Sequence, residues 1–170
     1  INIINNKNKG ILFWVTGLSG SGKTTIAKQI KPYIEKKYGP TIIINGDDMR
    51  KILKLNKYDK DSRLDNGKKF SKLCKLITNQ KINIIFSVVG LFHSLHSWNR
   101  KNIENYCEIF LKTSIKKIIK TKKKKIYYTH KKNIVGLDIK PEFPKKADIV
   151  INNSFQQKIN QISKKIIQKL

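Results

Sequence analysis

The sequence predicts an α/β fold in which a five-stranded, mostly parallel sheet carries helices on both faces. Five short runs rich in β-branched residues are separated by stretches whose apolar residues have helical spacing. Each run is almost continuously apolar rather than alternating, which is typical of parallel strands covered on both sides. The expected strands are residues 11–16, 41–45, 82–89, 107–112 and 148–151.

Helices are expected between and after these strands. The first should stop at Tyr38-Gly39-Pro40, because glycine ends helices readily and proline cannot continue them. The last should follow Asn153-Ser154, whose side chains can cap its first turn. With no linker or internal repeat, residues 11–170 are expected to form a single domain behind a flexible N-terminus of residues 1–10. The expected helices are residues 25–37, 48–55, 63–79, 97–105 and 155–170.

The turn after the first strand has the sequence Gly17-Leu18-Ser19-Gly20-Ser21-Gly22-Lys23-Thr24, which fits the phosphate-binding pattern GxxxxGK[ST] between a strand and a helix. Its glycines let successive backbone N–H groups point inward and form an anion site with the helix N-terminus. Lys23 would reach the β- and γ-phosphates, and the Thr24 hydroxyl would bind Mg²⁺. The fold is therefore expected to be that of a P-loop NTPase. The residues expected to bind ATP are Gly17, Leu18, Ser19, Gly20, Ser21, Gly22, Lys23, Thr24 and Thr25.

The formal net charge of +26 invites a nucleic-acid interpretation. Yet the excess is nearly all lysine, since Arg50, Arg63 and Arg100 are the only arginines, and no recognition motif accompanies it. A solvated lysine surface is the preferred interpretation, and nucleic acid is not the expected partner. No apolar run is long enough to cross a bilayer, so we expect a cytoplasmic protein. Cys74 and Cys107 are far apart in apolar segments and are expected to be buried and reduced.

The second strand runs into Asn45-Gly46-Asp47-Asp48-Met49-Arg50. Ligands of open α/β sheets bind beyond the carboxyl ends of the strands, so this turn should face the phosphate-binding loop. Asp47 is the candidate catalytic carboxylate, because it could take a proton from an attacking hydroxyl or hold Mg²⁺. Arg50 could clamp a phosphate. Capping of a helix by Asp47 and Asp48 is the simpler alternative, and it is compatible with catalysis.

Residues 116–132 form the least globular segment and contain four consecutive lysines. They are either a solvated face or a mobile lid over the nucleotide. His93 and His96 could share one helix face, but no further metal ligands accompany them. Polar support or surface roles are therefore expected for both histidines.

Several motifs together resemble the adenylylsulfate kinases. Residues 17–27 are similar to the family's GLSGxGKTTIA, and residues 45–50 are similar to its DGDxxR. Residues 58–66 resemble FSxxDRxxN, and residues 133–138 resemble NFTGID. Residues 142–148 keep the spacing of the tail YExPxxPD through Glu142, Pro144 and Asp148. The resemblance spans most of residues 11–153.

The resemblance implies transfer of the ATP γ-phosphoryl group to the 3′-hydroxyl of adenosine 5′-phosphosulfate, a small-molecule nucleotide, in sulfate assimilation. It implies ATP and Mg²⁺ as cofactors and a possible homodimer. Lys23 and Asp47 would be catalytic, and Thr24 and Asp47 would hold the metal. Lys124 and Tyr127 would belong to the lid. The implied acceptor-binding residues are Asp47, Arg50, Tyr58, Arg63, Asn66, Val88 and Val89.

Departures from the family pattern concentrate on the acceptor side. Asn45 replaces the first aspartate of DGD, and Ser62 replaces the aspartate beside the family arginine. The family's FISPYR segment is here SVVGLF at residues 87–92, without its proline and arginine, and the lid pattern is reduced. Residues 91–103 resemble a branch associated with surface-polysaccharide gene clusters, in which one activity is phosphorylation of cytidine diphosphoramidate. Cytidine diphosphoramidate is therefore the alternative acceptor to adenosine 5′-phosphosulfate. A second alternative is that the chain is an inactive or nucleic-acid-associated P-loop protein.

Overall fold

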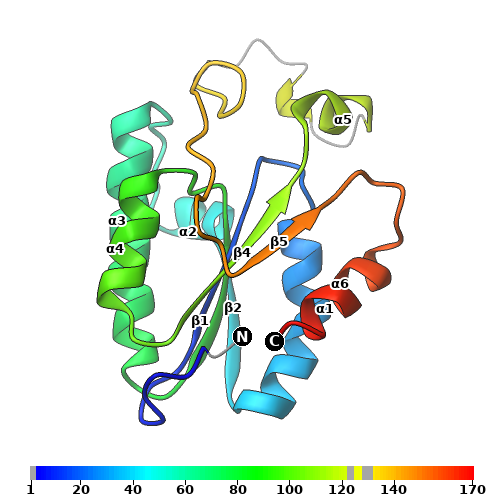
Figure 1. Cartoon of the computed structure of the whole chain (residues 1–170). Helices are drawn as coiled ribbons and strands as arrows, with labels where there is room; N and C mark the ends of the chain where they lie inside the picture. Colours follow the sequence, from blue (N-terminus) through cyan, green and yellow to red (C-terminus); the bar gives the residue numbers. More distant parts are fainter. Residues whose placement is uncertain (1–2, 122–124, 128–131) are drawn as a thin grey trace.

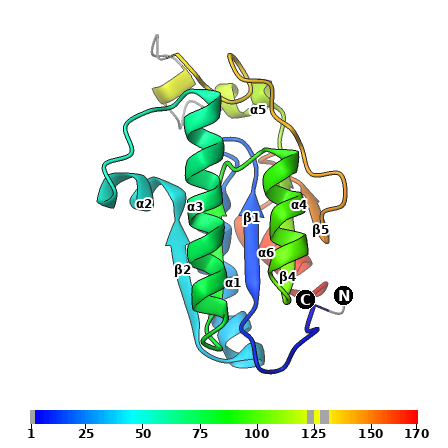
Figure 2. The same cartoon turned by 90° about the vertical axis from the view of Figure 1, so that its left-hand side faces the viewer.

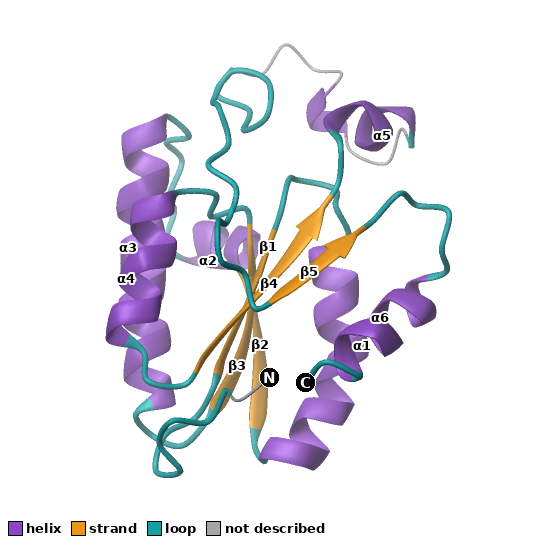
Figure 3. Ribbon diagram, in the orientation of Figure 1, coloured by secondary structure: helices purple, strands orange, loops and turns teal. Residues whose placement is uncertain are grey.

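Five strands form one sheet in which every pair is parallel, in the order β2-β3-β1-β4-β5 (Figure 1 and Figure 3). This computed structural model describes residues 3–121, 125–127 and 132–170. The expected fold class is confirmed, and each expected strand is present within a few residues of its expected bounds. The strands are β1 (Leu12–Thr16), β2 (Thr41–Asn45), β3 (Asn83–Val88), β4 (Tyr106–Lys112) and β5 (Ile149–Asn152).

Helices cover both faces of the sheet. On one face lie α1 (Lys23–Tyr38) and α6 (Ile159–Ile167), and on the other lie α3 (Lys60–Thr78) and α4 (His93–Asn102), which face the viewer in Figure 2. The shorter helices, near the carboxyl ends of the strands, are α2 (Gly46–Ile52), α5 (Ile115–Lys120) and the 3₁₀ helix η1 (Lys125–Tyr127). Within the described ranges, no helix has the length and apolarity to span a membrane.

The central strand β1 is buried on both sides. Phe13 and Val15 pack with the cluster under α1 and α6, whereas Leu12 and Trp14 pack with the cluster under α3 and α4. The Trp14 ring stacks on Phe86 with centroids 5.2 Å apart. Burial on both faces removes the need for polar residues at alternate positions, which explains the continuous apolar pattern of the strands.

All five expected helices are present, the first three begin two or three residues earlier than expected, and two others begin four residues away from their expected starts. α4 begins at His93 rather than at residue 97, because the Glu142 carboxylate accepts a hydrogen bond from the His93 backbone N–H at 2.7 Å and caps its first turn. α6 begins at Ile159 rather than at residue 155, since Phe155 has a left-handed φ of 64° that a right-handed helix excludes. Both causes involve tertiary structure that helical periodicity does not reveal.

Helix α5 was not expected, because it lies at the start of the lysine-rich segment. The Ser114 hydroxyl accepts a hydrogen bond from the Lys117 N–H at 3.3 Å, and Ile118 is buried. A serine cap and one buried isoleucine thus support a short helix among lysines.

Residues 3–10, expected to be flexible, lie against the start of β4. Ile3 is only 4% exposed. The buried Asn105 side chain accepts hydrogen bonds from the backbone N–H groups of Asn5 at 2.7 Å and Asn6 at 2.9 Å, and donates one to the Asn6 carbonyl at 2.7 Å. One asparagine therefore connects this segment to the domain.

Candidate active site

A cavity of about 510 Å³ lies at the carboxyl ends of the strands. Four segments contribute most of its lining: the P-loop (residues 17–25), the turn after β2 (residues 45–50), residues 87–92 at the end of β3, here called the β3 wall, and residues 153–162. Helix α3 and Val135 contribute the rest. Thr16 pairs with Val88 and Asn45 pairs with Ser87, so three of these segments leave the sheet at the same level. Parallel pairing thus brings together motifs that are far apart in the sequence.

The P-loop has the backbone conformation that its glycines permit. Gly17 has a φ of 149°, and a Cβ atom there would lie 2.7 Å from the Leu111 carbonyl oxygen. Gly22 has a φ of 94° and immediately precedes α1, which begins at Lys23. The first N–H groups of α1 have no partner within the helix, and they add to its positive N-terminal dipole. The P-loop therefore provides an anion site.

Side chains at the P-loop fall into two groups. Lys23, Thr24 and Thr25 line the cavity, and the Lys23 ammonium donates a hydrogen bond to the Leu18 carbonyl at 2.8 Å. Ser21 instead lies buried beneath the loop. Lys23 already points across the loop that would hold a phosphate.

Asn153 supports the P-loop from the end of β5. Its side-chain amide donates a hydrogen bond to the Ser21 carbonyl at 3.0 Å and accepts one from the Phe155 N–H at 3.0 Å. Sequence reasoning gave Asn153 a role as a helix cap. That expectation was wrong, because α6 begins later and Lys158 is its N-cap.

Asp47 is exposed on the first turn of α2 and is the one carboxylate that lines the cavity among the described residues. The Asn45 side chain donates a hydrogen bond to the Asp48 carboxylate at 2.9 Å and accepts one from the Ser87 hydroxyl. Asp48 does not line the cavity. Asp47 is therefore the candidate base and metal ligand, and Asp48 is not placed to share either role.

Two arginines face the P-loop across the cavity, and both lie over the ring of Tyr58. The distance from the guanidinium carbon to the ring centroid is 4.5 Å for Arg50 and 5.2 Å for Arg63. Burial and the neighbouring Arg50 lower the pKa of Arg63 from its ordinary value, but a guanidinium stays protonated. The predicted clamp residues therefore bring two positive charges to one wall of the cavity.

Tyr58 and Asn66 lie beside the cavity without lining it. The Tyr58 ring packs under both arginines and is still 45% exposed, and Asn66 is buried on α3, where the cavity is lined by Gly67 and Phe70. Their contribution to acceptor binding stays a prediction.

The β3 wall lines the cavity through Val88 and Val89, together with Ser87, Gly90 and Phe92, and acceptor binding by Val88 and Val89 stays a prediction. Every one of these side chains is apolar or small. The wall thus limits the shape of a ligand more than it pairs with charge.

The lid residue Tyr127 donates a hydrogen bond to the Ser19 carbonyl of the P-loop at 2.8 Å. Its burial raises the pKa of the Tyr127 hydroxyl. Arg63 donates to the Asn133 carbonyl at 2.9 Å, and Val135 lines the cavity. The predicted lid, through Tyr127, and the segment that follows it therefore contact the site. Lys124, the other predicted lid residue, lies outside the described residues.

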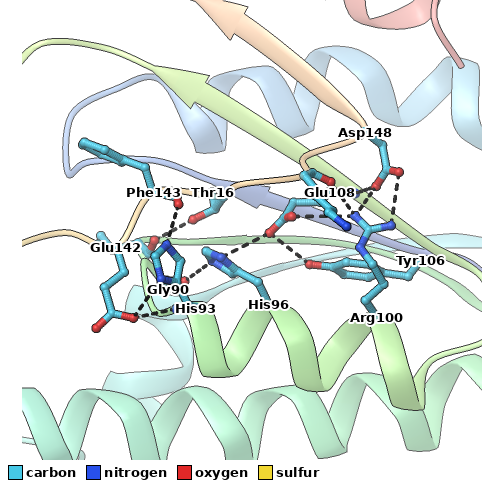
Figure 4. A network of polar contacts seen from close by, with 12 residues as sticks. Thr16, Gly90, His93, His96, Arg100, Tyr106, Glu108, Glu142, Phe143 and Asp148 are labelled. Atoms are coloured by element: carbon cyan, nitrogen blue, oxygen red, sulfur yellow. Dashed lines mark hydrogen bonds and ion pairs between the residues drawn. The ribbon is translucent and has the colours of Figure 1, made fainter.

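A buried polar network lies behind the β3 wall (Figure 4). The His96 Nε2 atom is 2.7 Å from the Gly90 carbonyl oxygen, and Nδ1 is 3.6 Å from Glu108 Oε1. Arg100 pairs with Asp148 at 2.9 Å and lies 3.7 Å from the other Glu108 oxygen. Burial raises the pKa of Glu108 to about 7 and lowers the pKa of His96 to about 4.

Sequence reasoning missed this network. His96 and Glu108 belong to different elements, and no spacing rule connects them. The one available signal was a glutamate inside the apolar strand β4.

The glycine-rich cradle at the end of β1, with a carboxylate and two arginines opposite, is the arrangement of a P-loop kinase. Comparison with known proteins identifies the family. The family model described as adenylylsulphate kinase matches residues 9–152, and the chain belongs to that family. The expected phosphotransferase class is thereby confirmed.

Individual relatives differ in the acceptor for which they are named. The chain is 35% identical over 168 residues to the cytidine diphosphoramidate kinase of Campylobacter jejuni, covering 96% of this chain and 98% of that protein. It is 29% identical to the adenylyl-sulfate kinase of Clostridium kluyveri, covering 90% of this chain and 81% of that protein.

The fold has a close structural match. The Mycobacterium tuberculosis APS kinase, solved in complex with AMPPNP and APS, has a TM-score of 0.84 and 20% identity, covering 95% of this chain and 97% of that chain. At this identity the match supports the fold.

Proposed function

We propose that this protein transfers the γ-phosphoryl group of ATP to the 3′-hydroxyl of a small nucleotide. The observation that carries the proposal is that one cavity is lined by the P-loop, by two arginines and, among the described residues, by one carboxylate. Phosphoryl transfer requires positioning and charge stabilisation more than covalent chemistry, and these groups supply both.

Each group has a defined task in the proposed reaction. The P-loop backbone and Lys23 would bind the ATP phosphates. The acceptor hydroxyl would attack the γ-phosphorus as its proton passes to Asp47, and the bond to the bridging oxygen of ADP would break. Arg50 and Arg63 would bind the anionic groups of the acceptor. The products are ADP and a 3′-phosphorylated nucleotide.

Thr24 and Asp47 line the same cavity and supply the oxygen ligands that Mg²⁺ prefers. These residues therefore fit a magnesium ion that is also bound by ATP phosphates. When bound, Mg²⁺ neutralises charge on the transferred group.

For the acceptor we favour cytidine diphosphoramidate. The 35% identical relative is named for that substrate, and the β3 wall has the sequence SVVGLF in place of the family's FISPYR. Adenosine 5′-phosphosulfate is the second candidate, favoured by the family model and by relatives named adenylyl-sulfate kinase. With that acceptor the protein would serve sulfate assimilation. Either reaction would take place in the cytoplasm, where ATP is available.

A coupled assay of ADP release tests the proposal. The wild-type protein is supplied with ATP and Mg²⁺ and with either cytidine diphosphoramidate or adenosine 5′-phosphosulfate, and the product is identified by mass. We expect kcat/KM to be higher with cytidine diphosphoramidate. Asp48→Asn is a matched control for Asp47→Asn, because Asp48 neighbours the site without lining the cavity.

The opposite preference would reassign the acceptor. Turnover with neither nucleotide, together with RNA binding that persists at physiological salt, would replace the proposal by a nucleic-acid function. A homodimer stays a prediction, which analytical ultracentrifugation would test.

A further inference from the structure

The β3 wall is held from behind by two side chains. The Thr16 hydroxyl on β1 donates a hydrogen bond to the Val89 carbonyl at 2.6 Å, and His96 Nε2 on α4 lies 2.7 Å from the Gly90 carbonyl oxygen. A trans peptide unit is planar, so fixing a carbonyl oxygen also orients the N–H of the next residue. Val89 and Gly90 both line the cavity. Their orientation therefore depends on Thr16 and His96.

The contact to Gly90 defines which nitrogen of His96 carries a proton. A carbonyl oxygen only accepts, so Nε2 must donate. The His96 side chain is 8% exposed, and burial lowers its pKa to about 4, which keeps the ring neutral. In the neutral ring Nδ1 is then an acceptor. Nδ1 has no hydrogen-bond partner in the part of the chain that the structure describes.

Glu108 is the group that faces Nδ1, at 3.6 Å, slightly longer than a hydrogen bond. Only the protonated carboxyl can donate to Nδ1. Burial raises the pKa of Glu108 to about 7, so that form is populated near neutral pH. Once the proton is lost, a carboxylate faces a nitrogen lone pair. The ring is then favoured to move its own proton to Nδ1, which removes the donor to Gly90.

The surrounding charges allow Glu108 to stay neutral. Arg100 on α4 bonds to Asp148 at 2.9 Å and lies farther from Glu108, at 3.7 Å. The Tyr106 hydroxyl on β4 donates to Glu108 Oε1 at 3.3 Å. Asp148 accepts from the Glu108 backbone N–H at 2.7 Å. The positive charge of Arg100 is therefore mainly matched by Asp148.

The remaining charged neighbours lie at the exposed end of α4. His93 Nδ1 is 3.8 Å from the Glu142 carboxylate, whose other oxygen is 3.7 Å from Lys60. The His93 side chain is 41% exposed, which makes it a solvent-facing counterpart to His96 three residues away.

We propose that His96 and Glu108 are positioning residues for the acceptor: a proton on Glu108 keeps the His96 Nε2–H on the Gly90 carbonyl, and loss of that proton loosens the β3 wall. This inference rests on the proposed function, because it assigns the wall to the acceptor. Neither residue lines the cavity, so both act through Gly90. ATP binding at the P-loop should be unaffected.

Steady-state kinetics between pH 6 and pH 9 test the proposal, with the acceptor on which the wild type is active. In the wild type the acceptor KM should rise above about pH 7. His96→Ala should raise it roughly three- to tenfold below pH 7, the effect of losing one hydrogen bond, and the two proteins should converge above pH 7, where the wild type has lost the same bond. Glu108→Gln should keep it low and flat, because the glutamine amide donates to Nδ1 at any pH. The ATP KM should change by less than about twofold in all variants, which is less than the effect of losing one hydrogen bond.

His93→Gln is the matched control and should behave as the wild type. Equal changes in the acceptor and ATP KM values of a folded His96→Ala protein would overturn the proposal. An unchanged acceptor KM would also overturn it.

Nitrogen NMR of protein labelled with ¹⁵N-histidine gives a readout that needs no turnover. The resonances that His96→Gln removes should be those of a neutral ring protonated at Nε2 at pH 6.5, and they should shift with a midpoint near the Glu108 pKa of about 7. An imidazolium pattern at pH 6.5 would overturn the proposed protonation. If the wild type phosphorylates neither nucleotide but the NMR result holds, the proposed function fails while the proton pairing stands.

Discussion

The two sides of the cavity are built by different means. The P-loop offers backbone N–H groups and the start of α1 to an anion, and its conformation follows from Gly17 and Gly22. The β3 wall presents small and apolar side chains, and it is oriented by Thr16 and His96 from other elements. The donor side therefore depends on local sequence, and the acceptor side depends on tertiary packing.

This difference explains why one side can change while the other does not. A substitution within GLSGSGKT is expected to alter the cradle directly, because Gly17 and Gly22 set its backbone conformation and Lys23 and Thr24 line the cavity. A substitution in the β3 wall changes the space offered to the acceptor and leaves the cradle intact. Relatives named for two acceptors can thus share one donor site.

The largest effect is expected from Lys23→Ala on the donor side. Removing the charge that faces the β- and γ-phosphates should lower kcat by about 10³-fold, the upper range for loss of a charge-stabilising donor. The fold should be unchanged, because Lys23 lines the cavity rather than the core. Single-turnover kinetics and circular dichroism check the two expectations. Near-normal turnover would contradict the role given to Lys23.

Asp47→Asn should have the next largest effect. Loss of a general base typically lowers the rate by about 10²-fold or more. The ATP affinity, measured by calorimetry with AMPPNP, should change much less, because the P-loop is intact. Wild-type kcat in this variant would remove Asp47 from the mechanism.

Arg63→Ala and Arg50→Ala should affect the acceptor side alone. Each removes a charge-assisted contact and should raise the acceptor KM by about 10- to 100-fold. The control is Lys60→Ala, because the Lys60 ammonium pairs with Glu142 outside the cavity. An unchanged acceptor KM in both arginine variants would place the acceptor elsewhere.

The last expectation concerns stability rather than turnover. Glu108 has a folded-state pKa of about 7 against an ordinary value of 4.5, so the folded protein binds its proton more tightly than the unfolded chain does. The resulting stabilisation is complete below pH 4.5, declines between pH 4.5 and pH 7, and is absent above pH 7. Glu108→Gln should remove this contribution, which urea unfolding at several pH values would measure. An identical pH profile for the variant would contradict the raised pKa.

The sequence was sufficient for those parts of the molecule that are encoded locally. The P-loop motif, the apolar strands and the turn containing Asp47 and Arg50 all lie in contiguous segments, so pattern and spacing located them. His96 and Glu108 could not be paired in advance, since only the packing of α4 on β4 joins them.

Two other differences have the same origin. Asn153 was expected to cap a helix. Its bond to the Ser21 carbonyl joins residues 132 positions apart, and sequence spacing does not reveal such a contact. Helix α5 was not expected, because lysines dominate its segment and only one of its isoleucines is buried. In each case the missing information was a long-range contact or a single buried side chain.

The register of β3 has a consequence for how such an enzyme could acquire a new substrate. β3 lies between β1 and β2, with Val88 beside Thr16 and Ser87 beside Asn45. A shift of its backbone would displace the strand ends that precede both the phosphate cradle and Asp47. Insertions and deletions in this strand would therefore be disruptive, whereas exchanges of single side chains would be tolerated. Within β3, changes of acceptor preference are therefore expected to come from point substitutions rather than from changes of length.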